Sequence, residues 1–158
     1  MIGRLRIPLL LAGITITTIA SSVRAADGAK VYAEHCAACH DVAGNGITGF
    51  APALAGPAAA RIKAPRGREY VAQVVVNGIT GVFELGGQRQ LGVMPSFATV
   101  SDADLAAALN QVLVGFNAAA LPADFKPIID AEIAAARALP RAPRDLHRTK
   151  EALEHAAK

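Results

Sequence analysis

The chain has 158 residues, of which 53% are hydrophobic and 4% are aromatic. This length accommodates one globular domain with an appendage but hardly two, and the apolar content excludes a disordered chain. Two cysteines are too few for a disulfide scaffold, and the formal charge of +3 falls to zero without the three arginines of the N-terminal segment, so the charge does not indicate a nucleic-acid partner.

Residues 1–25 are typical of an export signal. Two arginines in the first six residues precede Ile7–Ala20, which is uncharged and mostly apolar. A membrane-spanning helix needs about 20 apolar residues, so this shorter run fits the core of a signal peptide better. Val23 and Ala25 supply the small residues before a cleavage site. We therefore expect cleavage after Ala25 and a periplasmic protein; the alternative is an uncleaved anchor, which would hold the chain at a membrane.

The pattern Cys-x-x-Cys-His at Cys36, Cys39 and His40 is the most informative feature, because the chain has no other cysteine. On a helix, positions i, i+3 and i+4 share one face, so all three side chains can point at one flat cofactor. Two thiols can add to the two vinyl groups of a haem, and the histidine can bind its iron. Three other uses of this motif fit less well. A thioredoxin-like redox pair would need a βαβ context, which the sequence does not show. A zinc site would need a fourth ligand, and His35 points elsewhere on a helix, while a plain disulfide would leave His40 unexplained.

The segment from about Asp27 to Phe116 resembles the class I c-type cytochromes that carry a single haem. Beside the Cys-x-x-Cys-His motif, Gly28 and Tyr32 are similar to the glycine and the aromatic residue of that family's first helix, which packs against the last core helix. The resemblance implies one covalently attached haem c, an all-α fold wrapped around it, and a function in electron transfer.

The segment Ala51–Leu54 resembles the proline-containing loop of the same family. In that family the proline carbonyl accepts a hydrogen bond from the imidazole that binds the iron, which orients the ring and tunes the metal. The resemblance therefore implies that Pro52 is a cofactor-binding residue beside His40. The alternative is an ordinary loop residue.

Basic residues gather after this loop, and a helix and a turn region follow. The cluster of Arg61, Lys63, Arg66 and Arg68 is either solvated surface or a contact for the haem propionates or an acidic partner. Glu69–Gly78 reads as a short helix ending at a glycine, although its β-branched residues also allow a strand. Val82–Val93 forms a small hairpin or a loop over the haem, in which we expect three apolar residues to face the haem or the core: Leu85, Leu91 and Val93.

Met94 is the candidate for the second axial ligand of the iron. The chain has one other methionine, Met1, which lies in the expected signal. A residue before a proline is disfavoured in helices, so Met94 sits in a loop, and a soft thioether suits low-spin iron. Methionine is also a common core filler. The resemblance, in which Met-Pro precedes the last helix, favours the ligand over the filler and over a ligand from the C-terminal histidines His147 and His155.

The clearest helix begins at Ser101, which is its N-cap. Apolar residues follow at steps of three and four, and this stripe is expected to cross the first helix at Gly28 and Tyr32. The stripe consists of Leu105, Leu109, Val112, Leu113 and Phe116.

The resemblance weakens beyond Phe116. Pro127–Ala138 reads as another helix with Pro127 in its first turn, and the tail after Pro140 is a marginal helix or disordered. It serves either as a docking arm or as solvated surface. The expected organisation is a signal peptide at residues 1–25, a cytochrome c domain at 26–118 and a partly helical or disordered extension at 119–158.

With both His40 and Met94 on the iron, no position remains for a substrate. The sequence therefore predicts a non-enzymatic one-electron carrier without a small-molecule substrate, whose partner is a periplasmic dehydrogenase or a terminal oxidase. Two alternatives remain open. One is a fixed electron-transfer subunit of a dehydrogenase complex, and the other is a gas-binding or peroxidatic haem protein in which Met94 is not a firm ligand.

Overall fold

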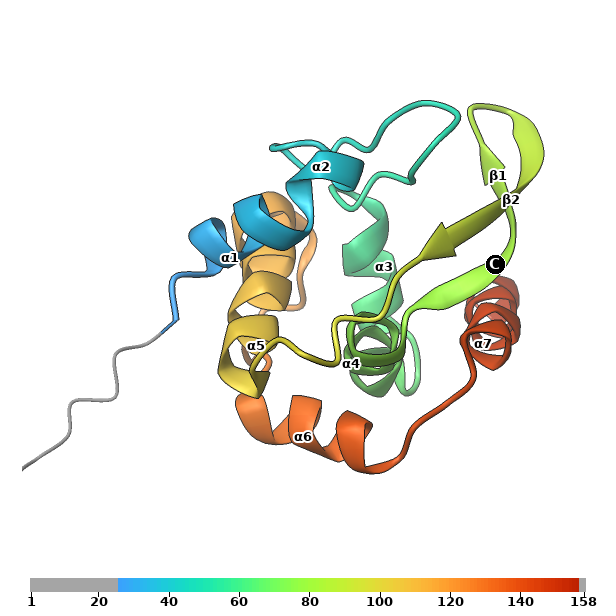
Figure 1. The fold of residues 1–158 in the computed structure, drawn as a ribbon. Helices are drawn as coiled ribbons and strands as arrows, with labels where there is room; N and C mark the ends of the chain where they lie inside the picture. Colours follow the sequence, from blue (N-terminus) through green and yellow to red (C-terminus); the bar gives the residue numbers. More distant parts are fainter. Residues whose placement is uncertain (1–25, 157–158) are drawn as a thin grey trace, which may run out of the picture.

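The computed structural model describes residues 26–156, with side chains to Glu154, so the expected signal peptide lies outside the described residues. In this part of the chain, the fold consists of helices and one antiparallel hairpin. The helices are α1 (Gly28–His35), α2 (Ala37–His40), α3 (Pro57–Lys63), α4 (Gly67–Asn77), α5 (Asp102–Asn110), α6 (Asp130–Ala138) and α7 (Pro143–Ala156), and the strands are β1 (Ile79–Leu85) and β2 (Gln88–Met94). The hairpin lies at one side of the molecule next to α4 and α7 (Figure 1). The mainly helical fold is confirmed, and of the loop and the hairpin that were open for the segment before Pro95 the structure has the hairpin. Met94 ends its second strand, so the expectation that it sits in a loop is wrong.

α1 crosses α5 at the predicted contact. Gly28 lies so close to α5 that a Cβ atom there would be 2.3 Å from the carbonyl oxygen of Ala107. The rings of Tyr32 and Phe116 meet edge to face, with their centroids 5.0 Å apart. Ser101 caps α5, because its side chain accepts a hydrogen bond from the backbone amide three residues on. The expected pairing of the first and last core helices is therefore confirmed.

α5 does not continue as a regular α-helix to Phe116. Gln111–Gly115 forms a π-helical turn, and a 3₁₀ turn follows at Ala118–Ala120. Such π turns insert an extra residue into a helix and are frequent near functional sites. Val112 and Leu113 lie in this turn and are buried in the main core.

The hairpin follows directly from the end of α4. Gly78 ends α4 with φ 75°. A Cβ atom at Gly78 would lie 2.5 Å from the carbonyl oxygen of Met94, so only glycine allows the start of β1 to lie so close to the end of β2. Gly86 and Gly87, both with positive φ, connect the strands, as the two-residue turn of a tight hairpin requires.

The expectation that Leu91 and Val93 face the haem or the core is wrong. Leu85 is buried as expected, but Leu91 and Val93 are 71% and 68% exposed. Side chains alternate between the two faces of a strand, and the more buried positions of this part of β2 are Gln90, Gly92 and Met94. Because Met94 points inward, Leu91 and Val93, which are three residues and one residue before it, point outward.

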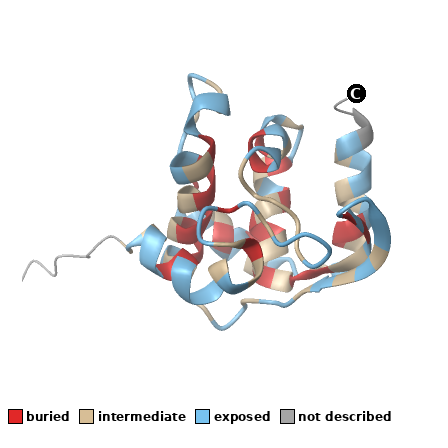
Figure 2. Cartoon of the chain, turned by 90° about the horizontal axis from the view of Figure 1, so that it is seen from above, coloured by how far each residue is buried: buried red, intermediate tan, exposed pale blue. Residues whose placement is uncertain are grey.

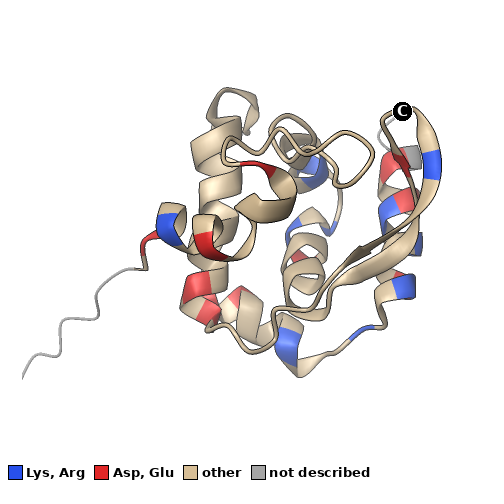
Figure 3. Ribbon diagram, turned by 45° about the horizontal axis from the view of Figure 1, so that its top comes forward, with Lys and Arg blue, Asp and Glu red and all other residues tan. Residues whose placement is uncertain are grey.

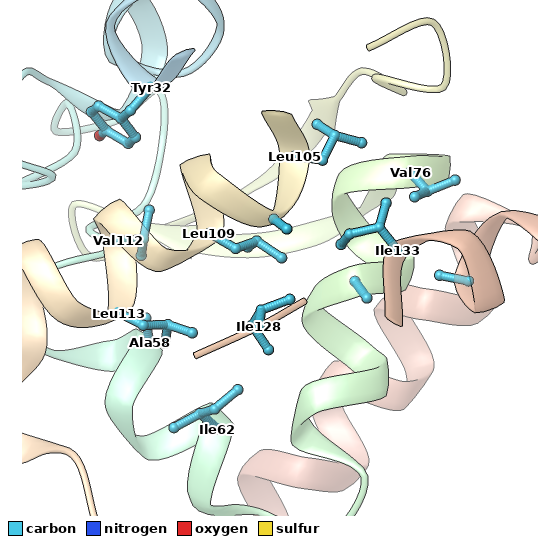
Figure 4. Packing of buried hydrophobic residues seen from close by; sticks show 13 residues of the cluster. Tyr32, Ala58, Ile62, Val76, Leu105, Leu109, Val112, Leu113, Ile128 and Ile133 are labelled. Atoms are coloured by element: carbon cyan, nitrogen blue, oxygen red, sulfur yellow. The ribbon is translucent and has the colours of Figure 1, made fainter. Parts of the chain in front are cut away.

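The buried residues lie along the inward faces of the helices (Figure 2). The main core joins α1, α3, α4, α5 and α6, and Figure 4 shows Leu109 and Ile128 lying among its members. A second cluster joins α4, the hairpin and α7. Its buried members are Tyr70, Ile79, Phe83, Leu85 and Leu146.

The helix expected at Pro127–Ala138 begins later than predicted, at Asp130. The side chain of Asn110 holds the preceding backbone extended, because it accepts a hydrogen bond from the Ile128 amide and donates one to the Ile128 carbonyl, both at 2.8 Å. Pro127 therefore lies before α6 and not in its first turn. Local sequence could not reveal this, since Asn110 belongs to α5.

Two ion pairs fasten α6 to the earlier helices. Arg68 on α4 pairs with Glu132 at 2.7 Å, and Arg137 on α6 pairs with Asp102 on α5 at 2.7 Å. Both arginines also donate to backbone carbonyls of neighbouring loops. Ile133 on the same helix is fully buried, so α6 shares the core of the domain.

The tail after Pro140, for which a marginal helix and disorder were both open, forms α7. Leu146 is fully buried, and the His147 ring meets Phe83 edge to face at a centroid distance of 4.8 Å. The His147 ring lies directly on Gly81, where a Cβ atom would be 2.2 Å from two ring carbons. α7 thus packs across β1 and α4. Within residues 26–156, no helix has the length and hydrophobicity needed to cross a membrane.

Candidate functional site

Cys36, Cys39 and His40 lie on one turn at the junction of α1 and α2. The Cys36 amide donates to the Tyr32 carbonyl and ends α1, while the Cys36 carbonyl accepts from the amides of Cys39 (3.1 Å) and His40 (2.9 Å). Both thiols are free. Burial, and secondarily Cys39, raise the pKa of the Cys36 thiol to about 11, so this thiol is neutral before any covalent modification.

His40 is 8% exposed, and its ring is held by the Pro52 carbonyl, which lies 2.9 Å from Nδ1. A carbonyl oxygen only accepts, so Nδ1 carries the proton and Nε2 has a free lone pair. Burial lowers the pKa of His40, although the bond to Pro52 opposes this shift. The imidazole is therefore neutral and oriented, as a metal ligand must be, and the hydrogen bond that the resemblance implies is present.

Two glycines bring Pro52 to this position. The amides of Leu54 and Ala55 donate to the Gly44 carbonyl, and the Gly46 amide donates to the His40 carbonyl. Gly46 has φ 74°, and a Cβ atom there would lie 2.6 Å from the carbonyl carbon of Pro52. The glycine-rich turn therefore folds back on itself and presents the Pro52 carbonyl to the imidazole.

Asn117 fixes the end of the same loop. Its Oδ1 accepts from the Gly56 amide at 2.6 Å, and its Nδ2 donates to the carbonyls of Leu54 (3.2 Å) and Val112 (2.7 Å). The residue is 3% exposed. It thus joins the loop after Pro52 to the π-helical turn. Nothing in the sequence around Asn117 signals this role, because two of its three partners, Leu54 and Gly56, lie more than 60 residues away along the chain.

A cavity opens between α1, α4, α5 and the hairpin, with about 1020 Å³ of empty space when its open mouth is included. Cys36, His40, Pro52 and Met94 all contribute to its walls, so the structure brings together four of the five predicted site residues. The fifth, Cys39, is half-buried on the same turn as His40. The other lining residues are almost all apolar, which suits a large flat apolar cofactor.

The basic cluster predicted at residues 61–68 separates into different environments. Arg61 lines the cavity. Lys63 is exposed, Arg66 pairs with Glu69 at 2.7 Å, and Arg68 pairs with Glu132. One further cation of the lining, Lys150 on α7, was not foreseen as part of a site.

Of the other histidines, His35 reaches the same cavity as His40, although the helix pattern predicts another face for it. His35 is exposed at the cavity, where its ring meets Phe97 at a centroid distance of 6.0 Å. His147 does not line the cavity, since its Nε2 donates to the Val82 carbonyl at 2.9 Å. The side chain of His155 lies outside the described side chains.

Comparison with known proteins decides the family, because residues 25–113, more than half of the chain, match the family model described as Cytochrome c. The chain belongs to the cytochrome c family. It is 40% identical over 121 residues to a cytochrome c-552 of Thermus thermophilus, which covers 77% of this chain and 92% of the relative. It is also 40% identical to a second cytochrome c-552 from a strain of the same species, over 81% of that relative.

As a member of the cytochrome c family, the protein binds covalently attached haem c and transfers electrons through it. The residues present fit this group. Two free thiols stand on one turn with a neutral histidine whose Nε2 is available, and the adjoining cavity is open at its mouth and almost entirely apolar. The haem supplies an iron that gains and loses one electron. The apolar walls of the cavity exclude water, and Pro52 fixes the ring of His40.

Proposed function

We propose that Cys36 and Cys39 bind the haem as thioethers, and that His40 and Met94 occupy its two axial positions. The observation that carries this assignment is that Met94 and His40 line the same cavity while His40 is oriented by Pro52. With both axial positions filled, no coordination site is open to a substrate. The protein then passes single electrons and performs no bond-making chemistry on a small molecule.

The Met94 assignment is tested by Met94→Ala. The haem should remain attached, but the iron should become high-spin and bind carbon monoxide in the reduced state, because one axial position is then open. Val93→Ala is the matched control, since Val93 precedes Met94 on the same strand and is 68% exposed. A low-spin Met94→Ala protein with an unchanged reduction potential would remove Met94 from the iron.

We further propose that the protein is exported, loses residues 1–25 and works in the periplasm. This rests on the charged start and the apolar run of that segment. The mass of the haem-loaded protein from a periplasmic fraction measures the cleavage directly. A mature chain that begins at Ala26 is expected, and a full-length chain recovered only with membranes would mean that the segment is an anchor.

The partner that we propose is another redox protein, either a dehydrogenase that donates electrons or a terminal oxidase that accepts them. A fixed subunit of a dehydrogenase complex would need a surface for permanent binding. Leu146 and Leu153 of α7 pack within the chain. This packing favours a mobile carrier over a subunit that uses α7 as a docking arm. Co-purification of a dehydrogenase in constant stoichiometry would reverse that preference.

A further inference from the structure

Two cations line a cavity whose other walls are almost entirely apolar. Arg61 reaches it from α3, and Lys150 reaches it from α7. Among the described residues, no other lysine, arginine, aspartate or glutamate lines this cavity. A charge beside an apolar cavity is costly unless a group of opposite charge meets it. The pair therefore indicates an anionic group at this end of the cavity.

Arg61 has a donor that the described protein does not use. Its side chain is 19% exposed, and its Nη2 lies 3.1 Å from Oε1 of Glu154. Its Nε is buried and, among the described residues, has no hydrogen-bond partner. A buried donor without an acceptor destabilises the folded protein, because it has lost its bond to water and gained none in return. An acceptor that enters the cavity would remove this destabilisation.

Lys150 is positioned by the docking of α7. Its Nζ donates to Oε2 of Glu154 at 2.8 Å and lies 5.5 Å from the centroid of the Phe83 ring. Its side chain is 16% exposed. His147, one turn earlier on the same face, rests on Gly81 of β1. The contact of α7 with the hairpin therefore also holds Lys150 at the cavity.

Glu154 is shared by both cations and does not balance them. Burial would raise its pKa, but the hydrogen bond from Lys150 and the charges of Lys150 and Arg61 outweigh burial and lower it. The carboxylate is therefore ionised at neutral pH. One negative charge against two positive charges leaves one positive charge uncompensated in this cluster, while α7 as a whole carries both signs (Figure 3).

We propose that Arg61 and Lys150 form a subsite for a propionate carboxylate of the haem, and that α7 is therefore part of the haem site. This inference rests on the proposed attachment at Cys36 and Cys39, because the propionates lie on the edge of a haem opposite its vinyl groups. α7 lies at the right of the molecule in Figure 1, away from α2. The family match ends at residue 113, so Lys150 and Glu154 come from a segment outside it.

The reduction potential tests the charge of this subsite. Lys150→Gln removes a positive charge beside the haem and so favours the oxidised form, which is more positive. At a fixed applied potential, the ratio of oxidised to reduced protein should rise about three- to tenfold, where tenfold is 59 mV for one electron. Glu154→Gln removes the opposing negative charge and should change the ratio in the other direction.

Two residues of the same helix provide matched controls. Arg148→Gln and Glu151→Gln make the same changes of charge, at side chains that are 73% and 54% exposed. Each should change the ratio by less than about twofold, because solvent screens exposed charges. Equal effects of Lys150→Gln and Arg148→Gln would show that only the net charge matters and would overturn the subsite.

Infrared difference spectra with haem labelled with ¹³C at the propionate carboxyls test the contact itself. Lys150→Gln and Arg61→Gln should shift the labelled carboxylate band, and Arg148→Gln should not. Lys150→Gln is the decisive variant, because glutamine keeps part of the packing of the lysine stem on Phe83 and so should preserve the fold. An unchanged band in Lys150→Gln overturns the subsite, whether or not Arg61→Gln folds. The optical spectrum of the unaltered protein reports the axial ligands, so a failure of the His40 and Met94 assignment would be seen separately.

Discussion

The ring of His40 is oriented by one backbone carbonyl, that of Pro52. Most of this arrangement could be predicted from the sequence. The Cys-x-x-Cys-His spacing is local and can be read directly, and Pro52 followed from resemblance to a known loop. The reason that Pro52 reaches the ring lies in Gly46, whose positive φ allows the loop backbone to approach closely. Asn117 could not be found in this way, because two of its three partners are brought to it only by the fold.

Asn117→Ala is expected to loosen the loop that carries Pro52. The substitution leaves the Gly56 amide and two carbonyls without their side-chain partner. We expect the free energy of unfolding of the haem-loaded protein to fall by about 1–3 kcal/mol in denaturant titrations. Asn45→Ala is the control, since Asn45 is exposed and bonds only to Asp41. Equal losses in the two variants would mean that Asn117 does not act as a clamp.

At the scale of elements, the sequence did not determine two features: which face of the second strand points inward, and whether the C-terminal tail packs against the hairpin. For the segment before Met94, the sequence allowed either a hairpin or a loop. In the hairpin, Met94 points inward, so Leu91 and Val93 on the opposite face of the strand point to solvent. The α7 tail has few apolar residues, but one of them, Leu146, is fully buried. Its docking depends on Gly81, whose missing side chain makes room for His147.

Gly81→Ala should displace α7 from the hairpin. The new methyl group would occupy the place of the His147 ring, so the ring and the helix that carries it must move. We expect a loss of about 1–3 kcal/mol in unfolding free energy. Amide hydrogen exchange should also become faster in α7 while α5 stays protected.

A double variant identifies the cause of that loss. In a His147→Ala background the ring is absent, so adding Gly81→Ala should cost clearly less than it does alone. Fully additive costs would show that the glycine serves the strand itself and not the docking of α7.

At the scale of the molecule, the C-terminal segment shares its core with the cytochrome c domain. Ile128, Ile133 and Ala136 belong to the same cluster as Tyr32 and the residues of α5. Sequence patterns predict the helices of the domain and the existence of α6, but they could not reveal which surfaces the segment covers. Those contacts depend on Asn110, Arg68 and Arg137, whose partners are remote along the chain.

The Arg68–Glu132 pair should make the docking of α6 sensitive to acid. The hydrogen bonds from Arg68 lower the pKa of Glu132 against the opposing effect of burial. A carboxylate whose pKa is depressed by folding stabilises the protein above its unfolded pKa and loses that contribution as the pH falls through the folded value. The thermal midpoint should therefore fall more in the native protein than in Glu132→Gln between about pH 6 and about pH 3. An identical fall in both proteins would exclude this pair as a source of the acid sensitivity.

Carbon monoxide binding to the reduced, haem-loaded protein at neutral pH tests most directly whether both axial positions are filled. An iron held by His40 and Met94 predicts a low-spin c-type spectrum, a methionine-to-iron charge-transfer band when oxidised, and no change on adding carbon monoxide. A high-spin spectrum, or rapid conversion to a carbon monoxide complex, would mean that Met94 does not hold the iron and would contradict a closed electron carrier.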